Sequence, residues 1–375
     1  MDFNFKEEQL AFADALKRWV SKDYSFDERK KIVHSAAGVS AAAWATLTEL
    51  GMLALPVPEA QGGFNGSAVD MFVVMQELGR GLVVEPYLAT VLGVQFLTLG
   101  GGHGDVLEQV AGGSLKLACA LTEQQSRHDV LDIATTATPS AAGFVLDGAK
   151  TVVVHGAQAD RLIVSARSGA GISLFLVPAD AAGVGITGYR TLDGMRAANI
   201  VFKQVQVSAA ALIGADGKGA DILDQAADYG ATLLCAEALG AMEAIFAATL
   251  DYLKTRSQFG APIGKFQALQ HRMADMYIHL EQARSMALLA AVRMGSDDAT
   301  ERRRTVSAAK FRVGQALKFV GQQAVQLHGG MGVTDELPAA HHFKRLTMIE
   351  LTLGDSDHHL QRFIAQPGFA QGIAE

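Results

Sequence analysis

Residues 256–267 read RSQFGAPIGKFQ, and residues 326–332 read QLHGGMG. Glycine adopts positive φ without strain, so a helix that runs into the second stretch is expected to end at its glycines. Arginine pairs with phosphate, and glycine has no side chain, so a ligand can approach its backbone closely. Both stretches therefore also suit an anionic ligand. On the residues alone, an interhelical turn and a ligand site both stay open for each stretch.

The residues around these two stretches have helical periodicity. From about residue 221 almost to the end, apolar residues recur every three or four positions, which predicts long amphipathic helices packed as a bundle. The first predicted helix carries Leu239, Met242, Phe246, Leu250 and Leu253, the second Met276, Leu280, Ala283, Ala287 and Ala290, and the third Val313, Leu317, Val320, Ala324 and Leu327.

The two preceding zones differ in pattern. Residues 1–115 look helical, with Leu10, Leu16 and Val20 at helical spacing and a Pro- and Gly-rich interruption at Pro56–Gly66. Residues 116–220 hold short β-rich runs, among them Thr151–Val154, Leu162–Val164 and Ile172–Val177. We expect an α+β multidomain protein with an N-terminal helical domain (1–115), a central antiparallel β domain (116–220) and a C-terminal four-helix bundle (221–375).

Two local features of the β zone are informative. Asp147-Gly148 stands between apolar runs, which favours a tight hairpin turn because glycine accepts positive φ. Leu121-Thr122-Glu123 follows a β run, where a strand end can offer backbone N–H groups and a hydroxyl to a ligand. No Gly-rich loop of the dinucleotide-binding or Walker type is found between a strand and a helix, so a bound dinucleotide would be held in another way.

Composition excludes several classes of function. The formal net charge of −7 argues against nucleic acid, whose phosphates require a positive surface. The two cysteines, Cys119 and Cys235, fit neither a disulfide framework nor a metal site. The first residues lack the apolar run of a signal peptide, and we expect no membrane span and no metal. The expected location is cytoplasmic.

Taken together, these motifs closely resemble the acyl-CoA dehydrogenase family over the whole chain. The matching segments are Phe3–Gln9, Leu50–Glu59, Glu77–Gly81, Leu121–Glu123, Lys150-Thr151, Arg256–Gln267 and Gln326–Gly332. The resemblance implies the three-domain order given above, with FAD at a subunit interface and an acyl-CoA thioester as substrate. It also implies a homo-oligomer, or a heteromer with a second acyl-CoA dehydrogenase-like chain, and an electron-transfer flavoprotein as electron acceptor.

The same resemblance implies which residues hold the FAD. The pyrophosphate and adenine end is assigned to the two Gly-containing stretches, and the isoalloxazine ring faces the β domain. The first group is Arg256, Phe259, Gln267, Gln326, Gly329 and Gly330, and the second is Leu121, Thr122, Val154 and His155.

Dehydrogenation of an acyl-CoA also requires a general base, which is best supplied by a carboxylate in a dry site. The family's usual glutamate precedes a glycine late in the chain, and that position is Leu353, followed by Gly354. The alternative position used by some members is Gly230. Because neither residue accepts a proton, we consider Glu350, one helical turn before Leu353, as the first candidate base and Asp355 as the second. Solvated or capping roles stay open for both.

The flavin-facing motif departs from the family as well. Arg127 and His128 stand where small residues and a serine are usual, and Val152–Val154 replaces the usual Trp-Ile-Thr. The adenine-side motifs are intact, and the pattern is most similar to the small-subunit type associated with pimeloyl-CoA dehydrogenases. The hypotheses are therefore a dehydrogenase or one subunit of it, a catalytically silent subunit that completes a partner's FAD site, and a flavin monooxygenase on the same fold.

Overall fold

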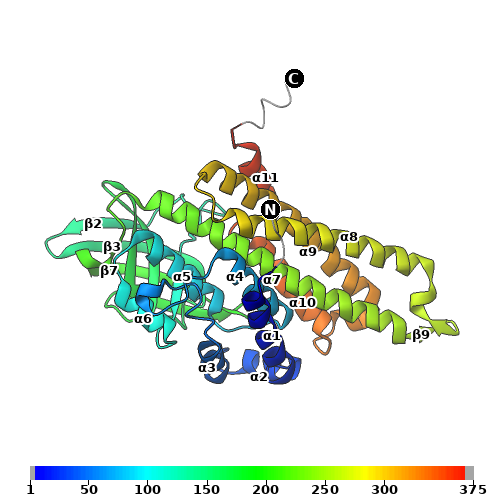
Figure 1. Cartoon of the computed structure of the whole chain (residues 1–375). Coiled ribbons are helices and arrows are strands. Elements are labelled where there is room, and N and C mark those ends of the chain that lie inside the picture. The colour runs from blue at the N-terminus through cyan, green and yellow to red at the C-terminus, as the bar shows by residue number, and fades with distance from the viewer. Residues whose placement is uncertain (1–4, 368–375) are drawn as a thin grey trace. The chain divides into compact units, whose positions relative to one another are not determined.

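The computed structural model describes residues 5–367 (Figure 1). Phe3 and Asn4, where the N-terminal family match begins, lie outside the described residues. Contacts divide the chain into two compact units. Among the described residues, the helical unit contains 5–29, 68–83 and 231–367, and the β unit contains Lys30–Ser67 and Val84–Gly230. Helices α2 (Phe26–His34) and α7 (Gly219–Thr255) each contain residues of both units.

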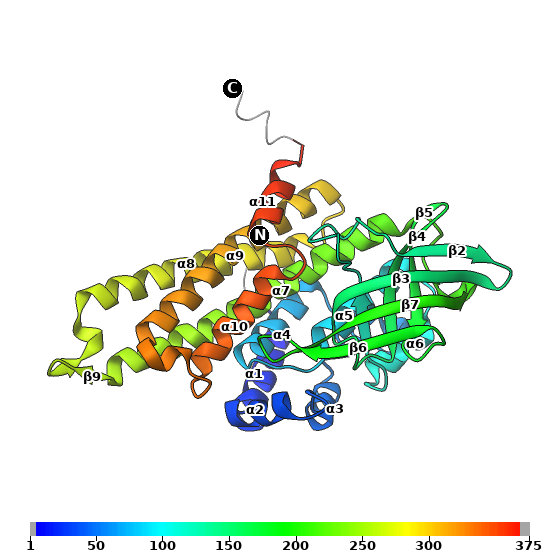
Figure 2. The same ribbon diagram turned by 180° about the vertical axis from the view of Figure 1, so that it is seen from behind.

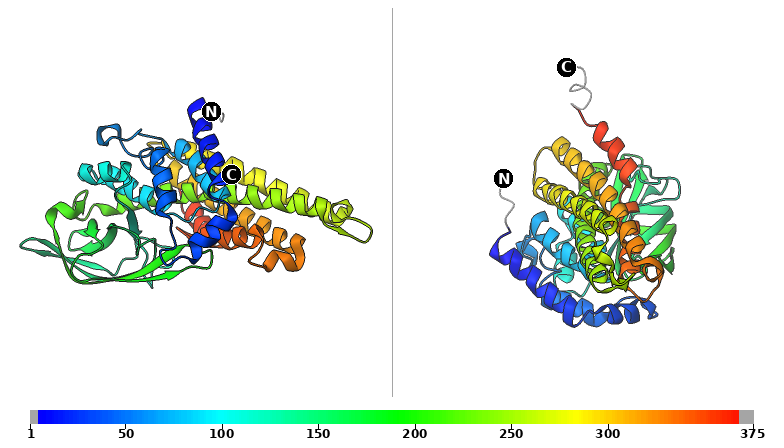
Figure 3. Two further views of the ribbon diagram at one scale, coloured as in Figure 1. Left: turned by 90° about the horizontal axis from the view of Figure 1, so that it is seen from below. Right: turned by 90° about the vertical axis from the view of Figure 1, so that its right-hand side faces the viewer.

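The helical unit consists of long helices and one small hairpin. It contains α1 (Glu7–Lys22), α4 (Ala68–Arg80), the greater part of α7, α8 (Gln267–Arg293), α9 (Ala299–His328), α10 (Pro338–Leu351) and α11 (Ser356–Ile364). Helices α8, α10 and α11 each pack against α9, and α4 packs against α1 and α8. Between α7 and α8 lies the hairpin of β9 (Ser257–Gln258) and β10 (Ala261–Pro262), at the end of the two long helices (Figures 1 and 3).

Close backbone contact sets the packing of α4 against α7. A Cβ atom placed on Gly79 would meet the carbonyl of Glu237, and one placed on Gly240 would meet the carbonyl of Gln76. Only glycine permits this approach, because any other residue would force the two helices apart. Gly79 lies inside α4, which ends at Arg80.

The apolar faces predicted for α8 and α9 are confirmed. Met276, Leu280 and Ala283 of α8 are buried, and so are the five apolar residues predicted for α9. In α7 the prediction is only partly right, because Phe246 and Leu250 are half-buried. In α1 the prediction is also partly right, because Leu16 is buried and Val20 half-buried, whereas Leu10 is half exposed and Trp19 is buried instead.

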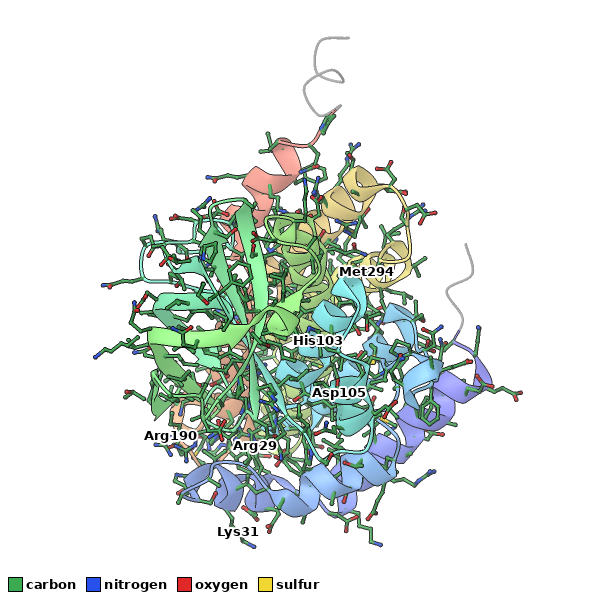
Figure 4. The ribbon with its side chains drawn as sticks, turned by 90° about the vertical axis from the view of Figure 1, so that its left-hand side faces the viewer. Arg29, Lys31, His103, Asp105, Arg190 and Met294 are labelled. Carbon is green, nitrogen blue, oxygen red and sulfur yellow. The ribbon has the colours of Figure 1, made fainter. Side chains whose placement is uncertain are left out.

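The β unit combines short helices with a sheet. The helices are α3 (Ala41–Glu49), α5 (Tyr87–Gly100), α6 (Gly104–Ala111) and the first part of α7. The strands are β1 (Leu117–Ala120), β2 (Thr136–Ser140), β3 (Gly143–Val154), β4 (Arg161–Ser168), β5 (Gly171–Pro178), β6 (Val184–Arg190), β7 (Arg196–Ser208) and β8 (Leu212–Ile213). Figure 4 shows His103 and Asp105 at the start of α6, where His103 Nε2 lies 3.1 Å from the Leu212 carbonyl.

The strands form one sheet in the order β6-β7-β3-β2-β4-β5-β8, with β1 beside β4. Figure 2 shows the part of this sheet from β6 to β5. The pairs are antiparallel except that β1 and β2 both run parallel to β4. The predicted strands at residues 151–154, 162–164 and 172–177 lie in β3, β4 and β5. The predicted fold class is confirmed, whereas the boundaries at residues 115 and 220 stay a prediction.

The hairpin turn predicted at Asp147-Gly148 is wrong. Strand β3 continues through both residues, and the turn between β2 and β3 lies at Ala141-Ala142 instead. Gly148 has a φ of 150°, and the register against β7 shifts between Leu146 and Gly148, which defines a β-bulge. The Asp147 carboxylate accepts a 2.9 Å hydrogen bond from the Gln204 backbone N–H, so the Asp-Gly pair fits a bulge as well as a turn.

Helix α7 differs from the expectation that no segment is apolar enough to span a membrane. A window of α7 has a mean hydropathy of 1.6, which passes that test by length and composition. Of this window, 67% is buried inside the protein, so packing in the core accounts for its apolar composition.

One buried histidine makes stability depend on pH. His342 of α10 is 5% exposed, and burial together with the nearby Arg29, His341 and Arg80 lowers its pKa to about 3. In the unfolded chain this histidine takes up a proton near pH 6.5, whereas in the folded chain it stays neutral at that pH. The free energy of unfolding therefore keeps its full value above pH 6.5 and decreases as the pH falls.

We therefore expect the unfolding free energy to fall between pH 6.5 and 5 by up to ~1.4 kcal/mol per pH unit through this residue. His342→Gln removes that contribution, and the remaining slope comes from other groups such as His359. Urea unfolding at several pH values measures the slope. The control is exposed His34→Gln, which leaves it unchanged, and an identical slope in His342→Gln contradicts the assignment.

Candidate cofactor site and base position

The structure brings the four flavin-facing candidates of the β unit together. Leu121 and Thr122 follow β1, and Val154 and His155 end β3. The backbone N–H of Thr151 donates a 2.8 Å hydrogen bond to the Thr122 carbonyl, which joins the two segments. Leu121 and His155 are buried, whereas Thr122 and Val154 are half-buried.

A buried ion pair lies directly beside these segments. Lys150 Nζ is 2.7 Å from Glu123 Oε1 and 2.9 Å from Ser165 Oγ. In the sequence, Glu123 and Lys150 are recognisable only as parts of family motifs, and their pairing was not predicted. The available signal was a lysine within an apolar strand, since a charge at such a position requires a partner.

The backbone between Lys150 and His155 is strained. Val152 has a φ of 53° and His155 a φ of 57°, and the register against β7 shifts between Lys150 and Val153. A β-branched residue at positive φ is an outlier that costs on the order of 1–3 kcal/mol and persists where the surroundings fix it. The Val152 side chain is 48% exposed, so this bulge lies at the surface of the β unit.

The second group of candidates lies at one end of the helical unit. Phe259 and Gly260 form the tip of the β9–β10 hairpin, and the Phe259 side chain is 92% exposed. Its ring lies 6.1 Å from that of Phe266 in an edge-on arrangement. Arg256 and Gln267, at the two ends of this segment, are exposed, and no described residue pairs with the Arg256 guanidinium.

The end of α9 completes this surface. Gln326, Gly329 and Gly330 are exposed, and a Cβ atom on either glycine would meet no atom within 4 Å. The His328 ring stacks on Tyr252 of α7 with centroids 4.5 Å apart, which fixes the end of α9 to the end of α7. Open glycine backbone and an unpaired guanidinium suit the pyrophosphate of FAD, and exposed aromatic rings suit its adenine.

A cavity of ≈ 410 Å³ lies under the hairpin. Leu253 and Met273 contribute apolar surface, and Lys254, Lys265 and Gln270 contribute polar groups. The Gln270 amide donates a 2.9 Å hydrogen bond to the Gly264 carbonyl, which holds the hairpin above the cavity. This cavity belongs to the same surface as the candidate FAD residues.

The position expected for the base is a tight turn after α10. Leu353 has a φ of 54°, and its carbonyl lies 2.9 Å from His359 Nε2. Burial keeps the pKa of His359 well below its ordinary value, so the neutral ring donates this bond through Nε2. The buried Lys310 ammonium donates to the carbonyls of Ile349 at 3.0 Å, Glu350 at 3.1 Å and Gly354 at 2.7 Å. Lys310 was also missed, although it falls on the buried face of α9.

Glu350 is buried beside this turn, and its carboxylate has partners of its own. Its Oε1 accepts hydrogen bonds from the Ser356 backbone N–H at 3.0 Å and hydroxyl at 2.9 Å, and it lies 2.6 Å from Lys318 Nζ. Burial raises the pKa of Glu350, but the bonds from Lys318 and Ser356 outweigh burial and lower it. A base for this reaction requires a raised pKa, so these contacts argue against the first candidate.

The remaining candidates have structural contacts or are poorly placed. The Asp355 carboxylate accepts a 2.8 Å hydrogen bond from the His358 N–H and caps α11. Gly230 is buried in α7, and the carboxylate of Asp228, two residues earlier, lies on a different helical face. Within residues 5–367, no group of three His, Cys, Asp or Glu side chains is placed to hold a metal ion.

Three family models match the chain in order. They describe the acyl-CoA dehydrogenase N-terminal domain at residues 6–102, the middle domain at residues 118–205 and the C-terminal domain at residues 217–366. The three matches follow the order of helices, sheet and helices seen in the structure.

Individual relatives agree with these matches. The mitochondrial short-chain specific acyl-CoA dehydrogenase of Bos taurus is 31% identical over 330 residues, which cover 84% of this chain and 79% of the relative. A variant of the Tcur3481–Tcur3483 steroid ACAD has a TM-score of 0.90 at 29% identity, covering 98% of this chain and 99% of that one. The ChsE4–ChsE5 complex of Mycobacterium tuberculosis has a TM-score of 0.90 at 26% identity, covering 100% and 99%. This chain belongs to the acyl-CoA dehydrogenase family, and its cofactor is FAD.

Proposed function

We propose that this chain is one subunit of an acyl-CoA dehydrogenase assembled from two homologous chains, with the catalytic base on the partner chain. The observation that carries this proposal is the turn at Leu353. Lys310 and His359 fix its backbone through the carbonyls of Leu353 and Gly354. The residue at the position that the family uses for its base nevertheless has an apolar side chain.

The nearby carboxylates support the same conclusion. Glu350 is held ionised by Lys318 and Ser356, and Asp355 caps α11. If Glu350 or Asp355 acted as the base, its carboxylate would have to leave the hydrogen bonds that fix the turn or the start of α11. A partner chain that brings a carboxylate to an FAD shared between subunits removes this difficulty.

The residues of this chain have roles that do not depend on a base. Arg256 and the open backbone at Gly329 and Gly330 bind the pyrophosphate, while Phe259 and Phe266 cover the adenine. The segments around Thr122 and Val154 orient the ring end and exclude water from one face. FAD, when bound, supplies the acceptor for the hydride that leaves the substrate β-carbon.

The comparisons support a two-chain enzyme. The names Tcur3481–Tcur3483 and ChsE4–ChsE5 each describe an assembly of two chains. The finer assignment to the small-subunit type associated with pimeloyl-CoA dehydrogenases is part of this proposal. So are a cytoplasmic location and transfer of electrons to an electron-transfer flavoprotein.

The FAD assignment predicts the effect of Arg256→Ala. A charge-assisted hydrogen bond to the pyrophosphate contributes ~1.5–3 kcal/mol, so FAD binding should weaken by roughly 10- to 100-fold. Fluorescence titration of the apoprotein with FAD measures the affinity. Arg293→Ala, at the opposite end of α8, is the matched control and should bind FAD as the wild type does. Unchanged affinity in Arg256→Ala would exclude this role for Arg256.

The missing-base proposal predicts a gain of function. The chain purified alone should dehydrogenate a panel of acyl-CoAs slowly or not at all, and Leu353→Glu should raise the rate by roughly 10²- to 10⁴-fold. Reduction of an artificial electron acceptor measures this rate. Leu351→Glu, at an exposed position two residues earlier, should give no gain.

Glu350→Gln separates this proposal from the candidate base in this chain. We expect it to leave the rate of Leu353→Glu within a few-fold. If the wild-type chain is active alone and Glu350→Gln lowers its rate by ~10²-fold or more while FAD stays bound, Glu350 is the base and the proposal is wrong.

A further inference from the structure

We propose that the buried Lys150–Glu123 pair is a positioning device, which sets the geometry of the flavin-facing backbone at Leu121–Thr122 and Val152–His155. The proposal rests on FAD binding by the family fold and on the orientation of its ring toward these two segments. It assigns to the pair a role in the geometry of the cofactor site beyond its contribution to folding.

The pair joins segments that are distant in sequence. Lys150 is fully buried and Glu123 is 4% exposed. Glu123 also accepts hydrogen bonds from the backbone N–H groups of Ala134 at 2.8 Å and Thr135 at 3.1 Å. One carboxylate therefore fixes both ends of the loop between β1 and β2, and Lys150 connects that loop to β3 and, through Ser165, to β4.

The flavin-facing residues are the immediate neighbours of the pair. Thr122 precedes Glu123, and Thr151 follows Lys150, and these two neighbours share the 2.8 Å backbone hydrogen bond. The next residue, Val152, is the strained one with a φ of 53°. At the far end of the bulge, the His155 N–H donates to the Arg196 carbonyl at 2.8 Å. Lys150 is thus one of two anchors that prevent Val152 from relaxing into ordinary extended backbone.

The Lys150–Glu123 pair is better explained by its effect on the geometry of the two backbone segments than by its contribution to folding stability. Removing two charges from water offsets most of the attraction between them, so an apolar replacement of a buried pair is often neutral or stabilising. A pair with directed hydrogen bonds fixes one arrangement of the two segments, whereas apolar side chains allow several. The ionised state is maintained at neutral pH: burial lowers the pKa of Lys150 to about 8, and bonds from Lys150 and Gln125 outweigh burial and lower that of Glu123 to about 2.

The test replaces the pair without leaving a buried charge. In Lys150→Met combined with Glu123→Gln, the single glutamine oxygen keeps one of the bonds from Ala134 and Thr135, because these two N–H groups donate to different oxygens of Glu123. The single variant Lys150→Met leaves Glu123 buried without its cation. It shows how much folding stability is lost when only one partner of the pair is removed. The control is Ser173→Ala on β5, which removes buried hydrogen bonds to Asp216 and Gly217 in the same unit.

Three measurements on the full-length chain report on the position of the two segments. Hydrogen exchange of the segment 150–156 should be at least tenfold faster in the double variant, because the Thr151–Thr122 bond is no longer held. The ratio of affinities for oxidised and reduced FAD should change about tenfold, which shifts the midpoint potential by about 30 mV for a two-electron couple. Visible circular dichroism of the bound flavin should change with it, and Ser173→Ala should alter none of these.

The outcomes separate this inference from the proposed function. A double variant with wild-type exchange at residues 150–156 overturns the inference, whether or not flavin binds. Faster exchange with an unchanged midpoint potential also overturns it, because the pair then serves folding alone. If the wild type and Ser173→Ala fail to bind FAD, the assignment of the cofactor site fails, and hydrogen exchange still decides whether the pair holds the two segments.

Discussion

A buried ammonium group requires oxygen atoms around it, and this requirement shapes the backbone in both units of the protein. The Lys310 ammonium donates hydrogen bonds to three carbonyls at the end of α10 and in the turn that follows. The Lys150 ammonium donates hydrogen bonds to the Glu123 carboxylate and the Ser165 hydroxyl. An unpartnered charge at either place would cost several kcal/mol, roughly the stability margin of a whole domain. The backbone has positive φ at Leu353, beside the Gly354 that Lys310 binds, and at Val152, two residues after Lys150.

The proposed two-chain enzyme agrees with the surface of this chain. The residues proposed to bind the adenine end of FAD lie at the tip of a hairpin and at the open glycine backbone after α9, where aromatic and apolar side chains such as Phe259 and Val333 are exposed. Burying such surface against another chain is favourable. At Leu353 the turn is held rigidly without a proton acceptor. In the proposed enzyme, this chain therefore supplies FAD-binding surface and its partner supplies the catalytic base.

Some local signals in the sequence were ambiguous, and the structure shows why. Asp147-Gly148 has the composition of a tight turn, but it forms a bulge because β7 lies beside it and Asp147 bonds Gln204. Glu350 has the right spacing from Leu353 for a replacement base, yet Ser356 and Lys318 occupy its carboxylate. In both cases the deciding contact comes from a residue that the local pattern does not contain.

The sequence by itself determined the fold class, the order of helices, sheet and helices, the buried faces of α8 and α9, and the family with its cofactor. These properties follow from periodicity and motifs within short stretches, where neighbouring residues share one element. Only the tertiary structure decided the pairing of Lys150 with Glu123, 27 residues apart, and of Lys310 with the Gly354 carbonyl, 44 residues apart. The sequence shows that a charge stands in an apolar stripe, but its partner is selected by packing, because the nearest acceptor in space belongs to another element of the fold.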